Sequence, residues 1–148
     1  MTIGGLHHVA LAVPDVAAAE SYYCELFDLD VLFREGSLDG DFGALPEGVD
    51  WPDARDAGVE PGLTFVGRDG LALALSHDPS APDGGHVDHI ALSVSEGELG
   101  DICDRARDLD CDVDQRESAA FVVDTNGVEW ELNTSSPPPE TPFRTLDI

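Results

Sequence analysis

The sequence predicts an α+β fold in which two copies of a βαβββ module form curved mixed sheets around a cavity. Residues 6–15 align without gaps on residues 87–96, at an offset of 81 positions. Residues 68–75 match residues 125–132 at an offset of 57, so the first half carries about 24 extra residues. Each half also has a helical pattern after its first matching stretch. A repeated supersecondary unit, and not two unrelated domains, is therefore expected.

In the first half, residues 6–13 alternate between faces and are rich in apolar side chains, which is typical of a strand with one buried face. Asp15 is placed to cap a helix that follows it. The Asp69–Gly70 pair stands between two alternating runs and predicts a hairpin. Residues 38–62 contain the extra segment and are dense in Gly, Pro and Asp. We expect them to form a long loop over one end of the sheet.

The second half repeats this order. Ser95 is placed to cap a helix with an apolar face, and the Asn126–Gly127 pair predicts a second hairpin. The chain is expected to be one domain over residues 1–148. Its predicted parts are module 1 (about 4–76), a linker (77–85), module 2 (86–134) and a Pro-rich, extended tail (135–148).

The charge of the chain excludes several classes of partner. It has 31 acidic residues against 7 basic ones, all Arg, for a formal charge of −24. Nucleic acid and acidic membrane surfaces need a basic footprint, which is missing. The acids are spread along the whole chain, which favours a protein from a salt-loaded cytoplasm, as in halophilic archaea. The alternative is an acidic cleft for a cationic ligand. No apolar run could span a bilayer, so a soluble cytoplasmic protein is expected.

The arrangement resembles the vicinal oxygen chelate superfamily, which includes glyoxalase I, methylmalonyl-CoA epimerase, extradiol dioxygenases, and the bleomycin- and fosfomycin-resistance proteins. The resemblance covers residues 6–133. It rests on a His-bearing strand that leads into an acidic helix start, on a turn before a strand that carries Glu, and on the duplication of both. Their order in each half makes the resemblance specific.

Two imidazoles, His8 and His89, stand at equivalent positions of the repeat. Each shares its strand face with small residues, which indicates a cavity near a pseudo-twofold axis. The resemblance implies that both are metal ligands and that Glu131 is the carboxylate ligand. The repeat equivalent of Glu131 is Ala74, which cannot coordinate, so three protein ligands remain. Two His and one carboxylate are typical of Fe(II) oxygenases; Mn, Zn or Ni are alternatives for the one divalent ion per site.

Three further residues have weaker assignments. His7 has the opposite strand parity to His8 and is expected to be structural or exposed. Glu129 shares a face with Glu131 and is a candidate second acid or base, although a solvated acid is the simpler interpretation. Arg116 is a candidate contact for an anionic substrate, with a surface ion pair as the alternative.

We therefore expect a metal-dependent enzyme with dioxygenase-like chemistry on a small molecule that chelates through vicinal oxygens. Glyoxalase I- or epimerase-like proton transfer is the first alternative, and a metal-free binding protein of the bleomycin-resistance type is the second. The superfamily members of this size that the chain resembles are commonly homodimers with shared sites. The resemblance therefore implies a homodimer in which His8 comes from one chain and His89 with Glu131 from the other. A site built within one chain is the alternative.

Overall fold

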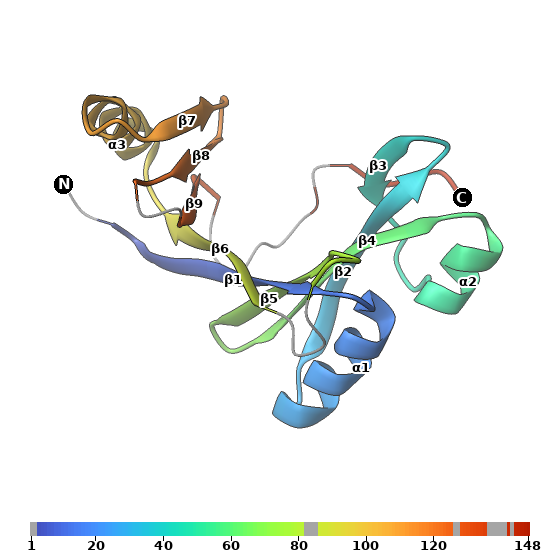
Figure 1. Cartoon of the computed structure of the whole chain (residues 1–148). Helices are drawn as coiled ribbons and strands as arrows, with labels where there is room; N and C mark the ends of the chain where they lie inside the picture. The colour runs from blue at the N-terminus through green and yellow to red at the C-terminus, as the bar shows by residue number, and fades with distance from the viewer. Residues whose placement is uncertain (1–2, 82–85, 126–127, 136–141, 143) are drawn as a thin grey trace.

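A computed structural model describes residues 3–81, 86–125, 128–135, 142 and 144–148. Its nine strands form one curved, unclosed sheet in the order β3-β2-β4-β5-β1-β6-β9-β8-β7 (Figure 1), so the predicted α+β class is confirmed. The strands are β1 (Gly5–Val13), β2 (Asp30–Leu38), β3 (Asp41–Ala44), β4 (Glu60–Arg68), β5 (Leu71–His77), β6 (His86–Ser93), β7 (Asp112–Gln115), β8 (Ala119–Val123) and β9 (Glu129–Asn133). The helices are α1 (Val16–Phe27), α2 (Trp51–Asp56) and α3 (Glu96–Asp108).

The two halves meet at the centre of the sheet, where β1 pairs antiparallel with β6. On either side of this pair a parallel strand follows, β5 beside β1 and β9 beside β6. Ala10 lies opposite Ala74 in the first half, and Ala91 lies opposite Glu131 in the second. Ala10 and Ala91 are 81 residues apart, and Ala74 and Glu131 are 57 residues apart. These are the two offsets of the sequence alignment, so the pairing register agrees with the alignment of the two halves.

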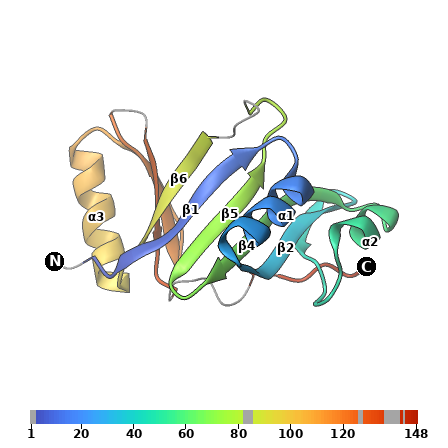
Figure 2. The ribbon, with the colours of Figure 1, turned by 90° about the horizontal axis from the view of Figure 1, so that it is seen from below.

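Both long helices begin where the sequence predicts. The Asp15 side chain accepts a hydrogen bond from the Ala18 N–H at 3.0 Å, and Ser95 forms a reciprocal capping box with Glu98. Helix α1 packs on β4 and β5, and α3 packs on β7 and β8, so the helices lie against the sheet at separate places (Figure 2). No helix among the described residues is long and apolar enough to cross a membrane.

The expectation of a long loop over residues 38–62 is wrong. This segment contains β3, α2 and the first residues of β4. The Asp50 side chain caps α2 through the Asp53 N–H at 2.9 Å, and a proline in the first turn favours the helix. Trp51 is fully buried and donates its indole N–H to Thr64 Oγ1 at 2.9 Å. A buried aromatic residue with a satisfied polar edge gives this Gly- and Pro-rich segment its fixed structure.

The predicted hairpin at Asp69–Gly70 is present between β4 and β5, and both residues have positive φ, 53° and 87°. The predicted turn at 126–127, linker residues 82–85, and tail residues 136–141 and 143 lie outside the described residues. The described end of the tail lies beside β3 (Figure 1). There the Leu146 N–H donates to the Ala44 carbonyl, and the Leu146 side chain, 4% exposed, joins the core of module 1.

Candidate metal centre

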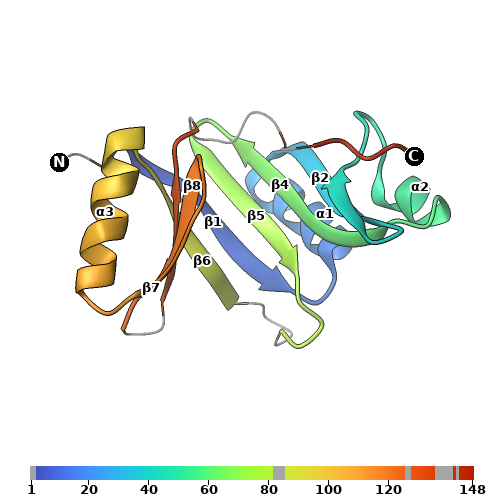
Figure 3. The same ribbon diagram turned by 90° about the horizontal axis from the view of Figure 1, so that it is seen from above.

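A cavity of about 590 Å³ lies on the face of the central strands that is turned away from α1, the face viewed in Figure 3. Helix α1 packs with Leu73 and Leu75 on one side of β5, whereas Ala74 lines the cavity on the other side. The alternation of side chains along each strand therefore separates an apolar helix-packed face from a cavity face. Both modules contribute to the lining, because the cavity spans the β1–β6 pair.

His8, His89 and Glu131 converge at one end of this cavity from β1, β6 and β9. His8 Nε2 lies 3.1 Å from His89 Nε2 and 3.2 Å from Glu131 Oε2, and His89 Nε2 lies 3.7 Å from the same oxygen. All three side chains belong to one chain. The expectation of a site shared between two chains therefore differs from the structure, in which β1 and β6 pair directly and bring the two histidines together.

Each histidine has a hydrogen-bond partner at its Nδ1 atom, on the side away from Glu131. His89 Nδ1 lies 2.8 Å from Asp88 Oδ2, and His8 Nδ1 lies 2.8 Å from His7 Nδ1. Both imidazoles are thus held at Nδ1 with Nε2 turned toward Glu131. Glu131 Oε2 is buried and has no hydrogen-bond partner among the described residues. A divalent ion bonded at about 2.0–2.2 Å holds its donors roughly 3.0–3.6 Å apart, so this donor set fits one ion.

The charges at the three groups favour a cation. Burial lowers the pKa of His8 to about 4, so this imidazole is neutral at pH 7 and has a lone pair to offer. Burial also opposes charge on His89, but the carboxylates of Glu131 and Asp88 outweigh it and raise its pKa. Burial alone would raise the pKa of Glu131, yet the adjacent histidines lower it. A buried carboxylate that is stabilised only by imidazoles creates a local demand for positive charge.

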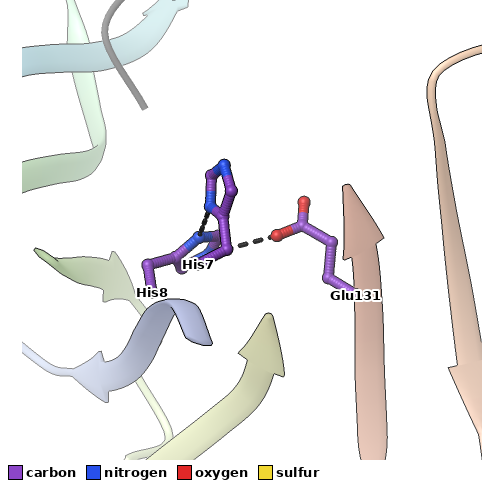
Figure 4. Close-up of side chains that lie close together, drawn as sticks. All are labelled: His7, His8 and Glu131. Atoms are coloured by element: carbon purple, nitrogen blue, oxygen red, sulfur yellow. Dashed lines mark hydrogen bonds and ion pairs between the residues drawn. The ribbon is translucent and has the colours of Figure 1, made fainter. Parts of the chain in front are cut away.

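His7 was expected to be structural or exposed, and the structure shows it buried. A register shift in β1 between Leu6 and His8 turns His7 to the cavity side, where it is 2% exposed. His7, His8 and Glu131 offer ligand atoms that all lie within 4.8 Å of one another (Figure 4). However, His7 contacts His8 through Nδ1 and Ser135 Oγ through Nε2 at 3.0 Å, so both of its nitrogens are engaged. The pair of histidines whose Nε2 atoms face each other and Glu131 is His8 and His89.

Ala74 lies at the position that mirrors Glu131 across the β1–β6 pair. Its side chain lines the cavity and is 3% exposed, in an apolar cluster with Ala10 and Phe65. A methyl group there offers no electron pair. Module 1 therefore supplies one donor, His8, and module 2 supplies two.

Glu129 and Arg116, the two weaker candidates, differ in whether they line the cavity of the three donors. Glu129 does not line the cavity; it lines a separate, more open depression, and its carboxylate lies within 4.8 Å of the ligand atoms of Asp88 and His89. Arg116 lines both hollows. Its guanidinium lies 5.2 Å from the centre of the Phe121 ring and forms a 3.0 Å ion pair with Asp114.

Two charged residues of the cavity were missed by sequence reasoning. Glu35 on β2 is 7% exposed, lies among the apolar lining residues Phe33 and Phe65, and has no ion-pair or hydrogen-bond partner among the described residues. Burial raises its pKa to about 7. Arg144, from the tail, also lines the cavity. The available signal for Glu35 was an acid two residues after Phe33, on the same face of a strand, but one acid among 31 does not stand out.

The fold and the convergent donor set define a duplicated βαβββ protein with a cavity on the seam between its modules. Residues 5–132 match the family model of the Glyoxalase/Bleomycin resistance protein/Dioxygenase superfamily, and the chain belongs to this superfamily. The comparison with curated proteins found no match.

Solved structures with low sequence identity share the fold. Methylmalonyl-CoA epimerase from Mycobacterium tuberculosis is 19% identical, with a TM-score of 0.57 over 93% of this chain and 91% of its own. The corresponding epimerase from Streptomyces coelicolor is 20% identical, with a TM-score of 0.56 over 91% and 99%. A Bacillus halodurans protein described as hypothetical is 15% identical, with a TM-score of 0.55 over 92% and 97%.

Proposed function

We propose that the protein is an enzyme that holds one divalent metal ion with His8, His89 and Glu131. The observation that carries this proposal is the buried Glu131 oxygen, which faces two imidazole Nε2 atoms and has no hydrogen-bond partner among the described residues. A protein seldom leaves a buried carboxylate oxygen unsatisfied unless a ligand completes it. Two nitrogens and one oxygen suit Fe(II), Mn(II), Ni(II) or Zn(II), and Fe(II) is our first expectation.

The substrate we propose is a small molecule with two neighbouring oxygens. The bound ion would supply Lewis-acid polarisation of these oxygens. Ala74 supports such a substrate, because its methyl group leaves room beside the donors. Phe33 and Phe65 would exclude water from the apolar part of the molecule, and Arg116 at the edge of the cavity would attract an anionic group.

Dioxygenase-like chemistry is the reaction class we propose first, because three protein donors leave coordination positions for both substrate and dioxygen. Proton transfer of the glyoxalase or epimerase type is the second candidate, and Glu35 is the observation that favours it. A carboxyl group with a pKa of about 7 can take or return a proton near neutral pH. It faces the same cavity as the proposed metal ligands.

Metal analysis tests the proposed site. Protein purified in molar salt without added metal is expected to contain one equivalent of a divalent ion. His89→Ala and Glu131→Gln should lose it, whereas Glu60→Gln, at an exposed carboxylate outside the cavity, should retain it. A metal-free wild type that also fails to take up Fe(II), Mn(II), Ni(II) and Zn(II) would contradict the proposal. That result would favour a metal-free binding protein.

Two assays separate the reaction classes. A dioxygenase consumes oxygen when a catechol-type substrate is added to the Fe(II)-loaded protein. A proton-transfer enzyme exchanges hydrogen for deuterium at a carbon beside a carbonyl, without oxygen consumption. In the second case Glu35→Gln should abolish the exchange and leave metal content unchanged.

The homodimer expected from the sequence is retained as a proposal and is measured by sedimentation in molar salt. Since the three donors meet within one chain, metal-free His8→Ala and Glu131→Ala proteins should not restore metal binding when they are mixed. Restoration in mixed dimers would show that the two modules pair between chains.

A further inference from the structure

His7 joins the proposed metal ligand His8 to a chain of hydrogen bonds that ends at β9. His7 Nδ1 lies 2.8 Å from His8 Nδ1, and His7 Nε2 lies 3.0 Å from Ser135 Oγ. Ser135 Oγ in turn lies 2.7 Å from Asn133 Oδ1. Asn133 is two residues beyond Glu131 on the same strand and is 8% exposed. This series of hydrogen bonds therefore starts at the proposed ligand His8 and ends on the strand that carries the proposed ligand Glu131.

The direction of each hydrogen bond follows from its fixed end. The Ser135 backbone N–H can only donate, and it lies 2.9 Å from Asn133 Oδ1, so this Asn133 atom is the amide oxygen, an acceptor. The Ser135 hydroxyl must then donate to the same oxygen, which leaves its own lone pairs to accept from His7 Nε2–H. A neutral imidazole protonated at Nε2 has an unprotonated Nδ1. His7 Nδ1 is therefore the acceptor for His8 Nδ1–H.

We propose that His7 is a positioning residue that fixes His8 as the Nδ1–H tautomer, with the Nε2 lone pair directed at the metal position. This inference rests on the proposed function. The opposite tautomer would place a proton on His8 Nε2, 3.2 Å from Glu131 Oε2, and would fill the space between two ligand atoms. His7 thus favours the form of His8 that can bind metal over the form that would pair with the carboxylate.

The role of His7 is tested by replacing one hydrogen-bond acceptor. His7→Leu removes the acceptor for His8 Nδ1–H, whereas His7→Asn can place an amide oxygen near the position of Nδ1. Loss of an outer partner of a metal-bound histidine typically lowers metal affinity about 10–100-fold. We expect this loss for His7→Leu, measured as Zn²⁺ affinity by chelator competition, and recovery to within roughly three-fold of wild type for His7→Asn. His77→Leu, at an exposed histidine at the end of β5, is the matched control and should bind as wild type.

Nitrogen-15 NMR of the metal-free protein reads the tautomer directly, without any metal. Wild-type His8 should carry its proton on Nδ1, and His7→Leu should move it to Nε2. An Nε2–H tautomer in the wild type would overturn the proposal, even if no variant folds. Equal Zn²⁺ affinity for wild type and His7→Leu would also overturn it, and so would a His7→Asn protein as weak as His7→Leu. A wild type that has the Nδ1–H tautomer but binds no metal would support the role of His7 and contradict only the proposed function.

Discussion

Glu35 should make the stability of the fold depend on pH in a way that one substitution removes. Its carboxyl group is 7% exposed and has no described partner, and burial raises its pKa from 4.5 to about 7. Glu35→Gln keeps the size of the side chain and cannot ionise. The folded state of the wild type binds the Glu35 proton more tightly than the unfolded state does. Its stabilising contribution is therefore complete below pH 4.5 and is lost as the pH rises through about 7.

The size of this effect follows from the shift. A pKa raised by about 2.5 corresponds to about 3 kcal/mol, because each unit is worth about 1.4 kcal/mol. Between the two pKa values the free energy of unfolding should fall by about 1.4 kcal/mol per pH unit in the wild type relative to Glu35→Gln. The Glu35→Gln protein should thus gain about 3 kcal/mol on the wild type between pH 4 and pH 8.

Urea unfolding in constant molar salt measures this difference at each pH, because screening holds the contribution of the other charges small. Glu60→Gln removes one exposed carboxylate at the start of the neighbouring strand β4, and serves as the control for the loss of one formal charge. Any pH dependence of that control is subtracted. Wild-type and Glu35→Gln curves that stay parallel within about 1 kcal/mol from pH 4 to pH 8 would refute a buried, unpaired Glu35.

Three other perturbations follow from the structure. Ala74→Glu should place a fourth donor opposite Glu131 and tighten Zn²⁺ binding in chelator competition. Unchanged affinity would contradict the pseudo-twofold register. Leu146→Ala should lower the free energy of unfolding by about 2–5 kcal/mol, since this side chain is buried in the core of module 1. Ile148 is exposed, and Ile148→Ala should change the free energy of unfolding by less than about 0.5 kcal/mol. Dialysis from molar to 0.05 M KCl should loosen the fold, because the net charge of −24 is then poorly screened. Circular dichroism measures this change, and an unchanged spectrum and melting temperature would contradict the expected need for salt.

The central strands could be predicted because their sequence pattern is repeated. The alternation around His8 and around His89 is specific to a strand with one buried face, and the duplication fixed which positions are equivalent. The convergence of these histidines on Glu131 follows from that register once β1 and β6 pair. The capping residues Asp15 and Ser95 were also predictable, because a helix start needs a side-chain acceptor at one defined position.

The features that depend on tertiary contacts could not be predicted in the same way. The position of His7 depends on a bulge, which adds a residue to one strand and leaves no mark on the alternation pattern. Helix α2 is held by the burial of Trp51, whereas its sequence is short and rich in turn formers. Glu35 has its raised pKa only because the folded chain buries it, in a cavity that is lined by several strands. In each case a local pattern is overridden by what packs against it.

The antiparallel β1–β6 pair has a consequence for how ligand and fold influence each other. His8 lies on one side of this seam, and His89 and Glu131 lie on the other, so a bound ion would act as a clamp between the chain halves. At a free metal concentration a hundred times its dissociation constant, such a clamp would add about 2.7 kcal/mol to the stability of the closed seam. Because binding and pairing are thermodynamically linked, a substitution that destabilises the β1–β6 pairing would also lower the affinity for the ion. A measured metal affinity would therefore also measure how stably the two modules pair through β1 and β6.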